Sequence, residues 1–118
     1  MTTPKTLRNR KRSLIDHDRI EEIGGLENPD IRRILDSFTR DLTGYLYLMD
    51  QQRAEENAVA LLATLHKLAG ASRTCGFSGI SRVVDAWMAS PKLLSSNFHT
   101  DLQSTIEASI AEWRCLVP

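Results

Sequence analysis

A long apolar stripe between residues 31 and 49 constrains the fold of this chain more than any other feature. Hydrophobic side chains recur there three and four residues apart, with charged residues between them. That spacing predicts an amphipathic α-helix of about five turns with one face against a core. Asn28 and Pro29 precede the stripe as an N-cap and a first-turn proline, and we expect the helix to end near Gln51–Arg53. The stripe consists of Ile31, Ile34, Leu35, Phe38, Leu42, Tyr45, Leu46 and Met49.

Four more segments carry helical signals, and none shows the alternation of a strand. We predict a short helix over 16–23, and longer ones over 54–75, from 77 to the Ser90-Pro91 pair, and from 102 almost to the C-terminus. Gly24 and Gly76 stand where the first two should end. The sequence therefore predicts an all-α fold, an antiparallel up-down four-helix bundle with a short additional N-terminal helix.

Charge divides the chain into two parts. Residues 1–13 carry five basic residues and no acidic one, which predicts a basic flexible N-terminal tail. The remaining residues, 14–118, hold 15 acids against 10 bases and are long enough for a single domain. An acidic body argues against nucleic-acid binding, although a nucleic-acid-binding protein that uses the basic tail stays open as an alternative.

Neither a membrane anchor nor a disulfide framework is indicated. No apolar run approaches the roughly 20 residues that span a bilayer, and no apolar segment follows the N-terminal charges. We therefore expect the chain to stay in the cytoplasm without membrane contact. We also expect the helical bundle to be a monomer. Cys75 and Cys115 are too few for a disulfide framework and lack zinc-ligand spacing, so we expect both to be small buried hydrophobes.

The sequence contains no phosphate-binding glycine loop, nucleophile elbow or metal-binding HExxH motif, which leaves three histidines as candidates for chemistry. His17 and His99 lie among polar residues near helix ends, and we expect both on the surface. His66 lies in the middle of the helix predicted over 54–75. The buried side of that helix is centred about 120° from His66, so the imidazole should face water.

The side chains around His66 are small or apolar. Gly70 lies one turn after it in a helix interior, where glycine costs ~1 kcal/mol relative to alanine. Close approach by another surface is the usual reason for such a glycine. A boundary histidine beside a helix-packing glycine remains the alternative. The residues within about 60° of His66 on the helix surface are Val59, Leu62, Ala63, Ala69, Gly70 and Arg73.

These residues resemble the histidine phosphotransfer (HPt) domain family. The family pattern is a mid-helix histidine, a hydrophobe two residues on, a glycine four residues on, and a second glycine ten residues on. His66, Leu68, Gly70 and Gly76 stand at those places, and the similarity is strongest over 65–84. It covers residues 14–118, which we identify as an HPt domain.

The resemblance implies a phosphorelay intermediate that is no enzyme and has no autonomous kinase activity. His66 would accept a phosphoryl group from a receiver-domain aspartate and pass it to another receiver. No cofactor is expected on this chain, because Mg²⁺ would belong to the receiver domains of response regulators or hybrid sensor kinases. The expected partner-docking residues are Val59, Leu62, Ala63, Ala69 and Gly70.

One position departs from the family pattern. The family often has a lysine three residues after the histidine, where this chain has Ala69. Lys67 and Arg73 are the remaining nearby cations, so we expect them to support the phosphoryl group. A helical adaptor that binds receiver or kinase domains without accepting phosphate stays open as an alternative.

Overall fold

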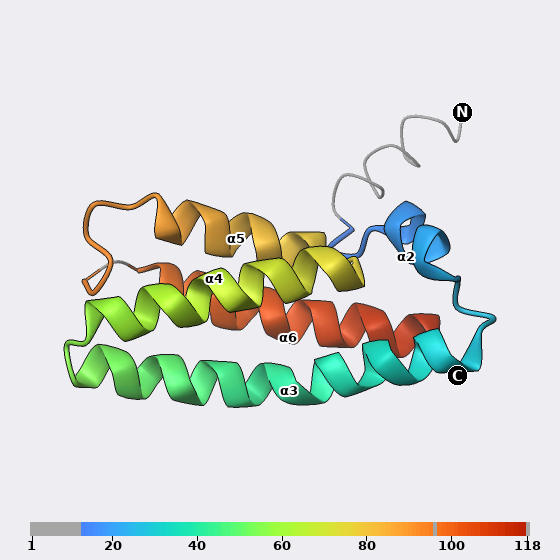
Figure 1. Cartoon of the computed structure of the whole chain (residues 1–118), viewed down its shortest axis with the longest axis horizontal. Coiled ribbons are helices and arrows are strands. Elements are labelled where there is room, and N and C mark those ends of the chain that lie inside the picture. Colours follow the sequence, from blue (N-terminus) through green and yellow to red (C-terminus); the bar gives the residue numbers. More distant parts are fainter. Residues whose placement is uncertain (1–12, 96, 118) are drawn as a thin grey trace.

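The computed structural model describes residues 13–95 and 97–117 of the chain. Four long helices run antiparallel to their chain neighbours, and a short helix covers one end of them (Figure 1). This arrangement confirms the predicted all-α fold. The helices are α2 (His17–Ile23), α3 (Pro29–Ala54), α4 (Ala58–Cys75), α5 (Ser78–Met88) and α6 (Phe98–Leu116).

Local capping chemistry explains where three of these helices begin or end. The Asp16 side chain accepts a hydrogen bond from the Arg19 backbone N–H at 3.1 Å, which satisfies a free donor at the start of α2. Asn28 caps α3 in the same way, with Pro29 in the first turn. Gly76 ends α4 in the left-handed conformation, with φ at 81°.

The start of α4 differs from the sequence prediction by four residues. Helix α3 continues through Ala54, and the chain then turns with Glu56 at a positive φ of 54°. The Asn57 side chain accepts a hydrogen bond from the Ala60 backbone N–H at 3.0 Å, so α4 begins at Ala58. A second asparagine cap therefore separates the two helices, and the prediction of a helix start near Ala54 was wrong.

The core lies between the four long helices and is mainly aliphatic, with a few aromatic rings packed into it. Phe38 packs edge-on against Phe77, whose ring centroid also lies 6.2 Å from that of Trp113. Each buried indole N–H has a partner, because Trp87 donates to the Leu93 carbonyl and Trp113 donates to the Asp36 carboxylate. Fully buried aliphatic residues include Leu35, Leu42, Leu61, Leu65, Leu68, Ile80 and Leu102.

The segment before α2 is bonded to the bundle. The Ser13 hydroxyl and the Leu14 N–H both donate to the Glu112 carboxylate of α6, at 2.6 and 3.0 Å. Gly79 donates its N–H to the Leu14 carbonyl. Ser13, which we assigned to the flexible tail, is thus tied to the domain, whereas residues 1–12 of that tail lie outside the described residues.

Two surface predictions require correction. His99 is largely buried, with its side chain 13% exposed and its Nε2 2.7 Å from the Asp50 carboxylate, because α6 begins early enough to pack it against Trp87. Cys115 is exposed near the end of α6, whereas Cys75 is buried as expected. Burial raises the pKa of the Cys75 thiol above its usual value, partly offset by the charge of Arg19. No helix in the described part of the chain is long and apolar enough to cross a membrane.

Candidate functional site

His66 projects from the middle of α4. The flanking residues of the helix, Leu65 and Leu68, are fully buried, whereas the His66 side chain is exposed. Helix α4 packs against α3 on one side and α5 on the other, and α6 lies behind them (Figure 1). The imidazole therefore lies on the outer side of a helix that packs against two neighbours, and its ring is accessible to a partner.

Apolar side chains lie next to His66 on the same side of α4. Val59 is 83% exposed and Leu62 is 45% exposed, and Ala63 is also exposed. We call the surface formed by Val59, Leu62, Ala63, His66 and Gly70 the His66 face. Exposed aliphatic residues that gather around one polar side chain are typical of a surface that another protein covers.

The space beside Gly70 is open. A Cβ built on Gly70 would meet no heavy atom of a described residue within 4 Å, and the residue is exposed. A helix-packing glycine would instead lie against a neighbouring helix, so packing inside this domain does not explain Gly70. The open space lies one turn from His66, which favours access to the imidazole as the reason for a glycine there.

Ala69 does not belong to the His66 face. Its side chain is fully buried, which removes it from the expected docking residues. The burial depends on how neighbouring helices pack against α4, which packs most extensively against α5. A lysine at this position would have to extend its ammonium group out of the helix interface.

The two expected cations have different surroundings. Lys67 is exposed, and no ion pair forms with it among the described residues. Arg73 is half exposed, and its Nη1 lies 2.8 Å from Oδ2 of Asp85 on α5. The sequence analysis did not include Asp85. Its only signal in the sequence was an opposite charge twelve residues on, across the turn at Gly76.

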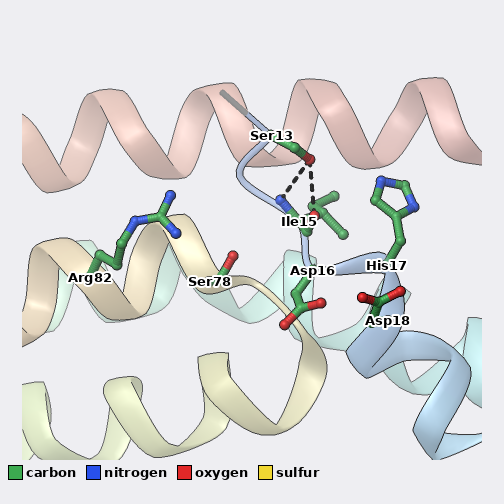
Figure 2. A pocket seen from close by; sticks show the side chains of 7 residues that line it. All are labelled: Ser13, Ile15, Asp16, His17, Asp18, Ser78 and Arg82. Atoms are coloured by element: carbon green, nitrogen blue, oxygen red, sulfur yellow. Dashed lines mark hydrogen bonds between the residues drawn. The ribbon is translucent and has the colours of Figure 1, made fainter. Parts of the chain in front are cut away.

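Three pockets formed by described residues lie away from His66. Figure 2 shows one of about 510 Å³ at the corner of α2 and α5, where the exposed His17 lies. Two others, of about 590 and 320 Å³, lie between α3 and α6 beside Trp113. Within the described residues, no group of three or more His, Cys, Asp or Glu side chains is arranged to hold a metal ion. His66 lines none of these three pockets and its side chain is exposed on α4, which suits a macromolecular partner better than a small substrate.

Comparison with known families identifies the class of this domain. The Hpt domain model matches residues 33–112, about two thirds of the chain, from the first turns of α3 to the last turns of α6. The chain belongs to the Hpt domain family. No curated protein and no solved structure matches it. Hpt domains are helical phosphocarrier modules that interact with receiver domains in two-component phosphorelays.

Proposed function

We propose that this domain is a phosphorelay intermediate that carries the phosphoryl group on His66. It would accept the group from the phosphorylated aspartate of one receiver domain and pass it to the aspartate of another. The observation that carries this proposal is the exposed imidazole in the middle of a packed helix, next to a glycine whose open space no described residue fills.

The chemistry requires little of the carrier beyond position. One ring nitrogen of neutral His66 attacks phosphorus with its lone pair, and the bond from phosphorus to the aspartate oxygen breaks, so the carboxylate leaves with that electron pair. The ring then carries the phosphoryl group on one nitrogen and its original proton on the other, and transfer to the next aspartate reverses these steps. In-line geometry and charge neutralisation dominate such reactions.

The donor and acceptor receivers would supply the remaining groups. Mg²⁺ would be bound by their acidic pockets, so this chain needs no cofactor and would have no kinase activity of its own. The exposed residues Val59, Leu62, Ala63 and Gly70 would contact the receiver, and Lys67 and Arg73 would offset the phosphoryl charge. We propose that the domain acts in the cytoplasm as a monomer.

The test is transfer from a phosphorylated receiver, followed by mapping of the labelled residue. We expect an acid-labile label on His66 that His66→Gln abolishes without loss of helicity, since the side chain is exposed. His17→Gln is the matched control, because it removes another exposed histidine and should leave labelling unchanged. A label on His17 or His99, or full labelling of His66→Gln, would refute the assignment.

A second candidate function is an adaptor that binds receiver or kinase domains without accepting phosphate. The alanine at position 69, where the family often has lysine, favours it. An adaptor would bind a receiver with unchanged affinity in His66→Gln, and no label would be found on the wild-type domain.

A further inference from the structure

The pair between Arg73 and Asp85 differs from the other arginine pairs of the domain. Elsewhere in the described residues, each arginine ion pair joins residues three or four positions apart on one helix. Arg73 and Asp85 instead join α4 to α5, and their side chains remain 53% and 49% exposed. Residue 73 lies on the same side of α4 as His66, but its guanidinium is held toward the neighbouring helix.

The path from Arg73 to His66 along α4 is open. Arg73 lies seven residues after His66, which is about 10 Å along the helix axis and only about 20° around it. Side chains on a helix lean toward its N-terminus, which here is the direction of His66. Gly70 lies between the two residues, and within residues 13–95 and 97–117 nothing fills the space beside it. An extended arginine side chain is longer than one helical turn of about 5.4 Å, so release from Asp85 would bring the guanidinium toward a group on His66.

We propose that Asp85 holds Arg73 aside in the unphosphorylated domain and that a phosphoryl group on His66 competes with Asp85 for it. The inference rests on the proposed function and describes how the same site is regulated. A phosphoryl group carries nearly two negative charges and three acceptor oxygens, against one charge on the carboxylate. A half-exposed pair such as Arg73–Asp85 is weak, so the exchange costs little. Asp85 is then a positioning residue that acts through Arg73.

The test is a double-mutant cycle on the equilibrium of phosphoryl transfer with one receiver. Asp85→Asn should shift this equilibrium toward phosphorylated His66 by about twofold to fivefold, the range that a weak exposed pair allows. Arg73→Ala should shift it the other way. In the Arg73→Ala background, Asp85→Asn should have little further effect, because no arginine remains to be released.

Asp30→Asn is the matched control. Asp30 pairs with Arg33 at 3.0 Å on an exposed part of α3, so this variant removes the same charge at an ordinary pair within one helix. It should leave the equilibrium unchanged. Circular dichroism of the variants confirms that the bundle is intact.

A second readout needs no receiver. Phosphoramidate can phosphorylate histidine directly, and in a His17→Gln background the ³¹P NMR shift of phosphorylated His66 can be followed against pH. A nearby cation favours the more negative form of the group, so Asp85→Asn should lower the pH midpoint of the shift and Arg73→Ala should raise it.

The outcomes separate the two proposals. Equal effects of Asp85→Asn with and without Arg73 would mean simple repulsion between Asp85 and phosphate, and would overturn the inference, as would no effect at all. A domain that no phosphorylated receiver labels on His66 would refute the proposed function, while the NMR titration would still decide whether Asp85 restrains Arg73.

Discussion

Gly70 permits a test in which stability and function should move in opposite directions. Glycine in a helix interior is about 1 kcal/mol less favourable than alanine. A Cβ at this position meets nothing within 4 Å, so no steric penalty offsets the gain. Gly70→Ala should therefore raise the free energy of unfolding by about 1 kcal/mol, which corresponds to about 4 °C in Tm for a domain of this size. Gly44 in α3 has equally open space, and Gly44→Ala should give a similar gain.

Gly70→Gln should also be at least as stable as the wild type but should slow phosphoryl transfer, because its side chain occupies the space beside His66. The assay is the initial rate of transfer from one phosphorylated receiver, together with urea unfolding of each variant. Ala108→Gln adds a similar side chain at an exposed position of α6, behind α4 in Figure 1, and should not change the rate. Equal rates for Gly70→Gln and wild type would refute the access argument, and a destabilised Gly70→Ala would refute the reasoning about space.

Three further predictions concern other residues. Gly76→Ala should lower the free energy of unfolding, measured by urea titration, by more than about 1 kcal/mol. The φ of residue 76 is 81°, and the new Cβ would lie 3.0 Å from the Asp16 carbonyl oxygen. An unchanged urea midpoint would contradict this prediction. Cys115 is exposed and should react rapidly with a thiol reagent at pH 8. Cys75 should react more slowly than Cys115 at this pH, because it is buried and its raised pKa leaves less thiolate. Equal reaction rates of the two thiols in the folded domain would refute this expectation. Leu62→Glu should weaken receiver binding with little effect on stability, since Leu62 is 45% exposed, and unchanged affinity measured by calorimetry would exclude Leu62 from the docking surface.

Much of the helix pattern could be predicted because its boundaries depend on local chemistry. Asn28 and Pro29 start α3 and Gly76 ends α4 through groups within a few residues in sequence. The boundary between α3 and α4 was misplaced because no glycine or proline marks the end of α3. Asn57 offers the same local capping signal as Asn28, but the turn before it depends on the positive φ of Glu56, which the residue type does not indicate.

The candidate site divides in the same way. Helical periodicity predicts that His66 faces solvent and that Val59, Leu62 and Gly70 lie on its side of the helix. It cannot say which flank a neighbouring helix covers, and Ala69 is fully buried in the structure. The link from Arg73 to Asp85 is also invisible to periodicity, because it depends on how two helices align after the turn at Gly76.

The two ends of the described chain leave the bundle near α2, opposite the turn between α3 and α4 (Figure 1). Ser13 is bonded to Glu112 near the end of α6, and Val117 lines the same pocket as Pro29 at the start of α3. His66 is ten residues before Gly76, or about 15 Å from that end along α4. A flexible linker of about ten residues spans a similar root-mean-square distance. A receiver fused at either end through such a linker would meet His66 at a high effective concentration, so a single polypeptide could report transfer without a diffusing partner.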